Sequence, residues 1–512
     1  MNRFKTALLG VTAFAAAGAS AVQEQKRAEG PFKPDMASLA QYQCPEWFRD
    51  AKFGIWAHWG PQSVPMFGDW YAKRMYVEGD KKYQYHLEHY GHPSRFGYKD
   101  IIPLWKAEKF DPDRLMALYK AAGARYFVSM GVHHDNFDLW DSKFHSWNAV
   151  QMGPKRDIVG AWKKAALAQG LKFGVSEHLG ASFTWWQPSH GADKKGPQAG
   201  VPYDGADPKW EDLYHPAALP GDNAWYSTDP RWAKEWLARI TDLVDSYQPD
   251  LLYSDGALPF GETGCKMLAH YYNANIAKRG GKLDVVYCLK DWTTKPGHGT
   301  YVEGIGVQDV ERGGLSGIKE QPWQTDTSIG DWFYNKEWKI KETGKMYRDA
   351  DWVIRTLADV VSKNGNMLLN VIQRPDGSID QEVEHLLEDL AVWMAINGEA
   401  IHGSRPWRVY GEGNAAVTGG AFKEDFGFSA DDIRFTQSKD GRTLYAIALG
   451  VPAVDVTIRA LAKADNKLVS NVQLLGSVEK LVWKQEADAL VIQKPSAWPS
   501  QHAVVFKVTL GN

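Results

Sequence analysis

Histidine and acidic side chains directly follow several apolar runs of this sequence. His133 and His134, Glu177 and Asp255 each stand at the end of such a run. Hydrolysis of a glycosidic bond requires two carboxyl groups in different protonation states, one that attacks the sugar or activates water and one that protonates the leaving oxygen. Asp255 and a second strand-end acid therefore suit that chemistry. An Asp before a glycine is also common in caps and turns, so Asp255 with Gly256 has a structural interpretation too.

The histidine pair allows three interpretations: metal ligation, hydrogen bonding to sugar hydroxyls and structural hydrogen bonding. Neighbouring side chains on an extended strand point to opposite faces, so His133 and His134 need a local bend to bind one ion. No HxH or HExxH motif stands beside them. Metal binding is therefore the least favoured of the three.

The elements that position these residues alternate between helices and strands from about residue 45 to residue 400. Asp111-Pro112, Asp157 and Asp229-Pro230 each have the residue types that begin a helix, and each predicted helix leads into an apolar run. A fourth helix, residues 350–363, precedes an apolar run at 366–371. Because active sites form at the carboxyl ends of barrel strands, the pattern predicts a (β/α)8-like TIM barrel. A doubly wound sheet places its ligands at the same edge and remains the alternative.

Three segments are predicted along the chain. Residues 1–21 have two early basic residues, an apolar stretch and small residues, which is typical of a cleaved signal peptide. Residues 22–400 form the predicted catalytic barrel. Residues 404–512 contain short β runs separated by polar turns, which predicts a C-terminal antiparallel β-sandwich that packs against the barrel or, alternatively, binds carbohydrate. We therefore expect an exported protein, periplasmic or secreted.

The composition narrows the possible partners of the 512-residue chain. The net charge of −3, with scattered Lys and Arg, argues against nucleic acid. Beyond residue 21 no run of about 20 apolar residues predicts a membrane span. The 23 Trp favour carbohydrate, whose C–H faces stack on aromatic rings. Trp185 and Trp186, in a long loop from about 180 to 225, either wall a sugar subsite or pack that loop. Three cysteines at irregular spacing do not organise the fold, although one disulfide remains possible.

Several motifs in order resemble one known family. They begin with WFRDAKFGIWAHWGPQSVP and GDWYAKRMY, continue with VHHDNFDLWDSKFHSWNAV and LLYSDG, and end with VVSKNGNMLLNV. Together, from about Trp47 to Gly403, they resemble the α-L-fucosidases of glycoside hydrolase family 29. The resemblance implies a (β/α)8-like barrel followed by a β-sandwich, a double-displacement mechanism through a covalent glycosyl-enzyme, and no metal or cofactor.

The resemblance also implies roles for individual residues. Asp255, the last residue but one of LLYSDG, matches the nucleophile. Glu311 in VQDVERGG is the preferred acid/base, and Glu303 in YVEGIG is the second candidate. A cation lowers the pKa of a nearby carboxyl group, so Arg312 should point away from Glu311. The expected sugar-contacting residues are His58, Asp69, Trp70, His133, His134, Glu177, Tyr253, Lys290 and Trp323.

The expected activity is the release of terminal α-L-fucose from a fucosylated oligosaccharide or polysaccharide. Two alternatives remain open at this point: a hydrolase for a related L-galacto-configured sugar or a sulfated fucan, and a fucose-binding protein without catalysis. The presence of both Asp255 and Glu311 argues against the second. The sequence does not predict the linkage preference or the oligomeric state.

Overall fold

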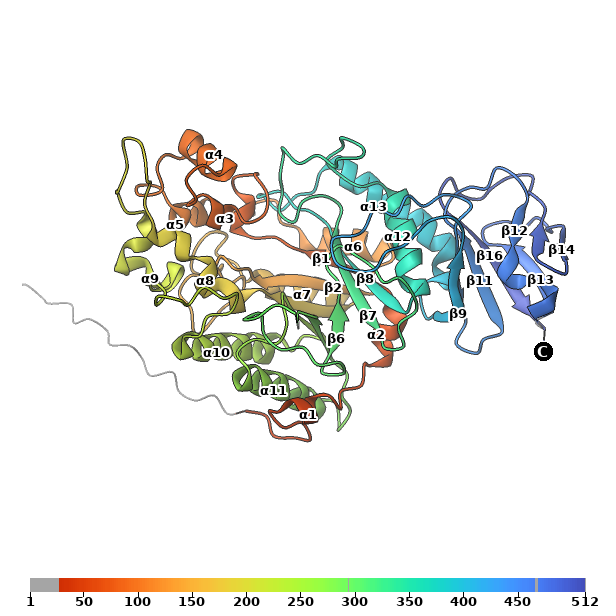
Figure 1. Cartoon of the computed structure of the whole chain (residues 1–512), viewed down its shortest axis with the longest axis horizontal. Coiled ribbons are helices and arrows are strands. Elements are labelled where there is room, and N and C mark those ends of the chain that lie inside the picture. The colour runs from red at the N-terminus through yellow and green to blue at the C-terminus, as the bar shows by residue number, and fades with distance from the viewer. Residues whose placement is uncertain (1–26, 293, 466–467, 512) are drawn as a thin grey trace, which may run out of the picture.

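The computed structural model describes residues 27–292, 294–465 and 468–511. These residues form a closed parallel barrel followed by two antiparallel sheets (Figure 1), which confirms the predicted fold class. The predicted signal peptide, residues 1–21, lies outside the described residues. Within the described ranges, no helix is long and apolar enough to cross a membrane. Cys44, Cys265 and Cys288 are all free, so no disulfide joins them.

The barrel in the described residues has eight parallel strands, which pair in sequence order. Pairing of the last strand with the first closes it. Almost every residue in them is buried, as expected of strands with packed side chains inside and helices outside. The strands are β1 (Phe53–Ala57), β2 (Tyr126–Val132), β3 (Lys172–Glu177), β4 (Leu251–Ser254), β5 (Val286–Lys290), β6 (Val307–Asp309), β7 (Trp323–Ser328) and β8 (Gly365–Asn370).

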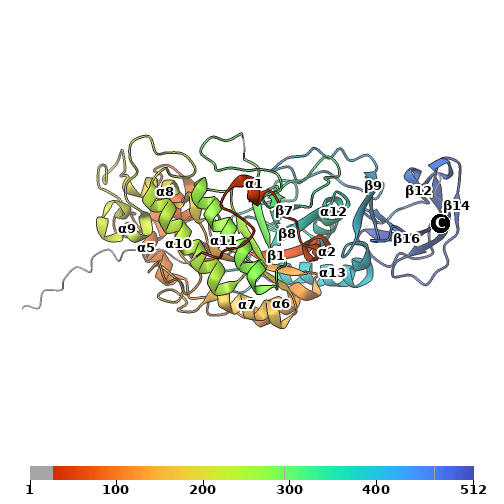
Figure 2. The ribbon, with the colours of Figure 1, turned by 90° about the horizontal axis from the view of Figure 1, so that it is seen from below.

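Long helices cover the outside of the barrel, and Figure 2 shows α6, α7, α10 and α11 along one side of it. The longest are α6 (Pro112–Ala121), α7 (Ile158–Ala168), α10 (Pro230–Tyr247), α11 (Glu262–Lys278), α12 (Ala350–Ser362) and α13 (Gln381–Asn397). Asp111, Asp157 and Asp229 cap α6, α7 and α10, each accepting a hydrogen bond from a backbone N–H of the first turn. The predicted start of each of these helices is confirmed.

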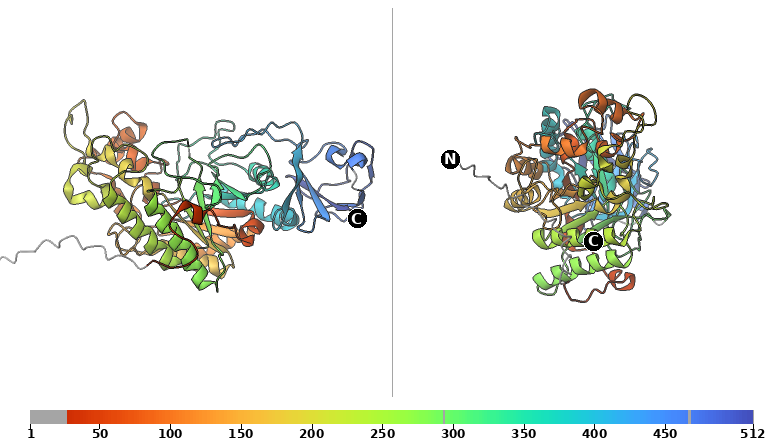
Figure 3. Two further views of the ribbon diagram at one scale, coloured as in Figure 1. Left: turned by 60° about the horizontal axis from the view of Figure 1, so that its bottom comes forward. Right: turned by 90° about the vertical axis from the view of Figure 1, so that its left-hand side faces the viewer.

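Shorter helices lie before β1 and in the loops that follow the barrel strands. They are α1 (Met36–Leu39), α2 (Glu46–Ala51), α3 (Tyr71–Arg74), α4 (Lys81–His89), α5 (Tyr98–Ile101), α8 (Ser182–Trp185) and α9 (Glu211–Tyr214). The last two belong to the long connection between β3 and α10, which contains Trp185 and Trp186. Both tryptophans are buried, so they pack this loop. Figures 1 and 3 show α3, α4, α5, α8 and α9 at the end of the molecule opposite the C-terminal sheets, whereas α1 packs on α11 and α2 on β8.

The C-terminal sheets have an apolar core of their own, which includes Phe435, Leu444, Ile492 and Phe506. One sheet has five strands in the order β13, β16, β11, β10, β9, and the other has three in the order β12, β15, β14. The strands are β9 (Arg405–Glu412), β10 (Ile433–Gln437), β11 (Thr443–Ala448), β12 (Val456–Ile458), β13 (Val469–Leu474), β14 (Trp483–Gln485), β15 (Leu490–Ile492) and β16 (Val504–Leu510).

A buried ion network joins the barrel to the larger C-terminal sheet. Asp359, on α12, accepts hydrogen bonds from Arg434 Nε on β10 and from Lys363 Nζ, both at 2.6 Å. All three side chains are almost completely buried. Since an uncompensated buried charge is very unfavourable, the network makes the packing of the two parts depend on Asp359.

Replacement of Asp359 by Ala is therefore expected to reduce the free energy of unfolding by about 3–5 kcal/mol, because two buried cations lose their anion. Urea denaturation followed by circular dichroism measures the change. Asp351→Ala, on the same helix, is the matched control, because its contacts with Arg355 and His502 are partly exposed. We expect that variant to lose less than about 1 kcal/mol. Equal losses in the two variants would contradict the role of the buried network.

Candidate active site

A cavity of about 240 Å³ opens at the carboxyl-terminal end of the barrel strands. It brings together seven predicted site residues: His58, Asp69, Trp70, His133, Tyr253, Asp255 and Glu311. The other residues that line it are Trp56, His178, Trp225, Trp292, Lys295, His298, Asp326, Trp332 and Phe422. The cavity therefore holds two carboxylates that sequence reasoning assigned to catalysis, surrounded by histidines and aromatic rings.

Asp255 lies one residue beyond β4, in contact with three nitrogen atoms. Its Oδ2 is 3.3 Å from His134 Nε2 and 3.4 Å from His178 Nδ1, and its Oδ1 is 3.7 Å from Lys290 Nζ. Burial alone would raise the pKa of Asp255, but His178, His134 and Lys290 outweigh that effect and hold the pKa well below its ordinary value. Asp255 is therefore an ionised carboxylate.

Glu311 lies two residues beyond β6 and has the opposite electrostatic behaviour. Burial raises its pKa to about 7, and the negative charges of Asp326 and Asp255 act in the same direction. Lys290, whose Nζ lies 3.1 Å from Glu311 Oε2, opposes the shift without cancelling it. At neutral or slightly acidic pH, Glu311 therefore carries a proton that it can donate.

Lys290 also limits the separation of the two acids. Its Nζ is 3.7 Å from Asp255 Oδ1 and 3.1 Å from Glu311 Oε2, so these oxygens lie no farther apart than the sum of those distances. That limit is compatible with the carboxyl separation of about 5–5.5 Å in retaining glycosidases, and it excludes most of the wider range of inverting ones.

Arg312 points away from Glu311, as expected. Its Nη1 lies 3.1 Å from Glu424 Oε1, its Nη2 donates to the carbonyl oxygen of Gly330 at 2.5 Å, and its guanidinium lies over the Trp332 ring. The positive charge is thus neutralised by Glu424, which leaves Lys290 as the cation in direct contact with the acid.

Several buried polar atoms that face the cavity have no hydrogen-bond partner within the described residues. They include His58 Nδ1, His178 Nε2 and Asp69 Oδ1. Burial lowers the pKa of His58 and His178, so both rings are neutral and can donate or accept. Because buried polar atoms are normally satisfied, this set indicates a ligand rich in hydroxyl groups.

The histidine pair reaches the cavity by a local distortion of β2. The pairing of β2 with β3 shifts register between Met130 and Val132, which lets His133 and His134 both reach the site. His133 Nδ1 bonds to Gln62 Nε2 at 2.8 Å, and His134 Nδ1 donates to the carbonyl oxygen of His178 at 2.6 Å. These bonds aim His133 Nε2 at Asp69 and His134 Nε2 at Asp255.

Five predicted residues do not line the cavity: His134 and Lys290, which contact Asp255, and Glu177, Trp323 and Glu303, which lie away from it. Glu177 is buried between β3 and α10, where its carboxylate accepts from Ser254 Oγ, Trp236 Nε1 and a backbone N–H. Trp323 is fully buried at the amino end of β7 and donates to the Lys363 carbonyl oxygen. These positions correct the prediction that Glu177 and Trp323 contact sugar. Glu303, the second acid/base candidate, is exposed and paired with Lys319.

The alternation of side chains along a strand explains why His178 and Asp326 reach the cavity, whereas the predicted Glu177 and Trp323 do not. Alternate side chains of a barrel strand point inward. Ser176 points inward, since its Oγ accepts from Trp56 Nε1, and therefore so does His178, whereas Glu177 points outward. On β7 the inward residue is Asp326, which lies 3.4 Å from Lys290 Nζ, and Trp323 points outward.

Among the described residues, two groups of three place possible metal ligands within 4.8 Å of one another. One is His58, His133 and His178, and the other is His134, His178 and Asp255. A zinc ion needs its ligand atoms at about 2.0–2.1 Å, so either group would have to contract around an ion. The same nitrogen atoms are free to bind sugar hydroxyls where they stand.

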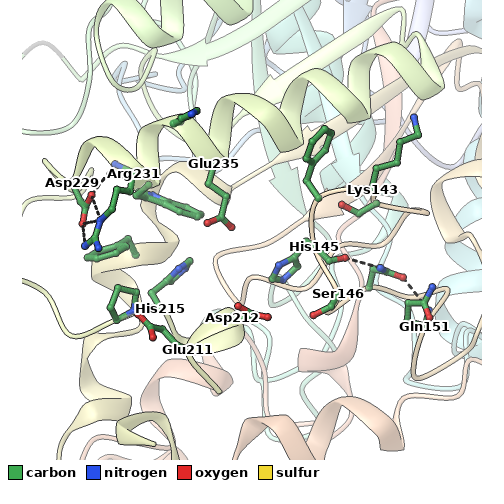
Figure 4. Close-up of a pocket in the computed structure, with 17 residues that line it drawn as sticks. Lys143, His145, Ser146, Gln151, Glu211, Asp212, His215, Asp229, Arg231 and Glu235 are labelled. Carbon is green, nitrogen blue, oxygen red and sulfur yellow. Dashed lines mark hydrogen bonds and ion pairs between the residues drawn. The ribbon is translucent and has the colours of Figure 1, made fainter. Parts of the chain in front are cut away.

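A larger cavity, of about 900 Å³, lies elsewhere, between the loop after β2, α9 and the start of α10 (Figure 4). Figure 4 shows Glu235 and His145 pointing into it. Two of its acids serve local structure: Asp229 caps α10 and pairs with Arg231, and Glu235 accepts from the buried Arg239. None of the predicted site residues lines this cavity.

Comparison with known protein families gives matches over both parts of the chain. The alpha-L-fucosidase family matches residues 19–399, and the alpha-L-fucosidase C-terminal domain matches residues 428–509. The chain is 28% identical over 505 residues to the tissue alpha-L-fucosidase of Homo sapiens, covering 96% of this chain and 94% of that one. It is 29% identical over 492 residues to the tissue alpha-L-fucosidase of Mus musculus, covering 94% of each.

Solved structures give the same answer for the fold. The Thermotoga maritima alpha-fucosidase in complex with fucose is 26% identical in sequence and superposes with a TM-score of 0.70. The match covers 93% of this chain and 100% of that one. The matched family spans the barrel, including Asp255 and Glu311, and the second match spans most of the C-terminal sheets. This chain therefore belongs to the alpha-L-fucosidase family of glycoside hydrolases, family 29.

Proposed function

We propose that this protein removes terminal α-L-fucosyl residues from glycans with retention of configuration, using Asp255 as nucleophile and Glu311 as acid/base. The observation that carries the proposal is the opposite protonation of two carboxyl groups that share one cation. Asp255 is held ionised by His178, His134 and Lys290, and burial raises the pKa of Glu311 to about 7. A nucleophile and a proton donor require these two states.

In the first step an oxygen of Asp255 attacks the anomeric carbon of fucose. The bond from that carbon to the leaving oxygen breaks, its electron pair stays on the oxygen, and Glu311 transfers its proton there. The product is a fucosyl ester of Asp255 together with the free aglycone. Lys290 keeps its charge throughout, since the surrounding carboxyl groups outweigh its burial and raise its pKa well above the ordinary value.

In the second step water replaces the aglycone. Glu311, now ionised, takes a proton from the water, the water oxygen attacks the anomeric carbon, and Asp255 leaves as a carboxylate. Two inversions at one carbon restore the original configuration. Both acids return to their starting protonation states.

The cavity suits the fucose ring itself. His58 Nδ1, His178 Nε2 and Asp69 Oδ1 offer unsatisfied polar atoms to ring hydroxyls, and Trp56 and Trp332 supply apolar surface. The bound fucose in the Thermotoga maritima relative supports this sugar as the ligand.

Proton NMR of the first product tests the proposed function. With an aryl α-L-fucoside as substrate, we expect α-L-fucose to appear first and the β anomer to grow in later by mutarotation. Initial β-L-fucose would contradict double displacement, and absence of hydrolysis would contradict the activity in this chain.

Replacement of Lys290 by Met is expected to lower kcat/KM on the order of 10²-fold, because the cation that organises the two acids is lost. Lys290 lowers the pKa of Asp255 and of Glu311, so both limbs of the pH profile should move to higher pH. Measurement of kcat/KM against pH checks the shift. Lys290→Arg, which keeps the charge, should move the limbs less. Unchanged limbs in the Met variant would contradict this role.

A further inference from the structure

A segment of the C-terminal part of the chain reaches the active site. Residues 413–432, here called the bridging segment, connect β9 to β10 and run along the loop that carries Glu311. The backbone N–H of Phe422 donates to the carbonyl oxygen of Glu311 at 2.8 Å, and that of Gly420 donates to Gly314 at 2.9 Å. The loop that carries Glu311 is thus hydrogen-bonded to a segment of the chain that lies outside the barrel.

Two acidic residues of the bridging segment form hydrogen bonds and ion pairs with the barrel. Glu424 is largely buried, accepts from Thr327 Oγ1 at 2.6 Å and pairs with Arg312 at 3.1 Å. The next residue, Asp425, pairs with Arg348 at 2.9 Å. Arg312 directly follows Glu311, and Glu424 is the anion that, with the Gly330 carbonyl oxygen and the Trp332 ring, holds its guanidinium away from that acid.

Phe422 is unusual in both exposure and backbone geometry. Its side chain is 67% exposed, yet it lines the active-site cavity. Its φ is +57°, and that of Arg312 is +44°, a region that side chains other than glycine occupy at a cost. Such conformations persist where the surroundings impose them, and they concentrate at functional sites.

The position of Phe422 indicates what it contacts. The buried histidines form the closed part of the cavity, so the fucose ring lies there and the aglycone points toward solvent. Glu311 must reach the oxygen that joins the two, and Phe422 is bonded to Glu311 and exposed. We propose that Phe422 forms an apolar wall for the leaving group, on which the ring of the neighbouring sugar stacks. Glu424 is a positioning residue that holds Arg312 away from the acid/base.

This inference rests on the proposed function, and the choice of substrates separates the two. α-L-Fucosyl fluoride has no aglycone ring and needs little help from a proton donor, whereas a fucosylated disaccharide needs both. We expect Phe422→Ala to lower kcat/KM about tenfold for the disaccharide, as for the loss of one aromatic contact, and to lower it much less for the fluoride. Absence of fluoride hydrolysis by the unmodified protein would overturn the proposed function.

Two further variants make the test decisive. Phe422→Leu keeps apolar bulk and the fold, and should retain part of the disaccharide activity. Val454→Ala, also on an exposed apolar side chain (70%) of the C-terminal part, should change neither substrate. Equal losses on the fluoride and the disaccharide in both Phe422 variants would overturn the stacking role.

Glu424→Gln tests the positioning role by a pH profile. Glu311 faces Lys290, Asp326 and Asp255 from the neighbouring strands. With Glu424 uncharged, Arg312 adds a second cation near Glu311, so the basic limb should move to lower pH on the disaccharide. A purely structural role would lower thermal stability and leave that limb in place, which would overturn the assignment.

Discussion

Asp255→Gly should lose on the order of 10⁴–10⁶-fold in kcat with an aryl α-L-fucoside, because the carboxylate proposed to form the covalent intermediate is removed. Sodium azide should restore part of the turnover. The small anion occupies the space left by the carboxylate and attacks the anomeric carbon from the same side, while Glu311 still protonates the leaving oxygen. The expected product is β-L-fucosyl azide, identified by NMR and mass spectrometry.

The isosteric variant Asp255→Asn is the matched control. Its amide is a poor nucleophile and still fills the space, so activity should be lost without rescue by azide. Folding of both variants is checked by thermal unfolding. Near-normal hydrolysis by Asp255→Gly, or an azide product of α configuration, would assign the nucleophile to another residue.

Much of the barrel could be predicted from local signals. Acid caps and helix-start prolines mark the starts of α6, α7 and α10, and each apolar run that followed is a strand. The signal is weaker where strands are short or polar. β6 has three residues, and β7 carries Gln324, Asp326 and Ser328 inside the barrel, so neither has the apolar run that predicts a strand.

The candidate site was predictable to the extent that strand ends were recognised. Asp255 and the histidines after β2 follow clear apolar runs, and the ordered motifs selected Glu311. The choice of Glu177 instead of His178 was wrong by one residue. Because side chains alternate across a strand, a one-residue error exchanges the inside of the barrel for the outside.

The remaining features of the site depend on contacts between distant parts of the chain. Phe422 reaches the cavity from beyond the barrel. Lys290 was predicted as a sugar contact, but its position between the acids arises because Asp255, Glu311 and Asp326 converge on it from three other strands. No local sequence pattern predicts such convergence, because the strand ends come together only when the barrel closes.

Glu311→Ala should lower kcat/KM on the order of 10²–10⁴-fold for a disaccharide, whose leaving oxygen needs a proton, and far less for α-L-fucosyl fluoride. In the unmodified protein Glu311 is protonated below its pKa of about 7, so activity should fall as pH rises through that value. The variant has no such group and should lose the basic limb. Kinetics on both substrates across pH measure these effects.

Azide gives this variant a product that distinguishes it from Asp255→Gly. Asp255 still forms the fucosyl ester, and azide, which needs no general base, then attacks that ester. Two inversions give α-L-fucosyl azide instead of the β anomer. Glu303→Ala is the matched control: it removes an exposed glutamate paired with Lys319 and should behave as the unmodified protein. If Glu303→Ala lost the basic limb and Glu311→Ala kept it, the proton donor would be Glu303, and the shared cation Lys290 would no longer explain the pair.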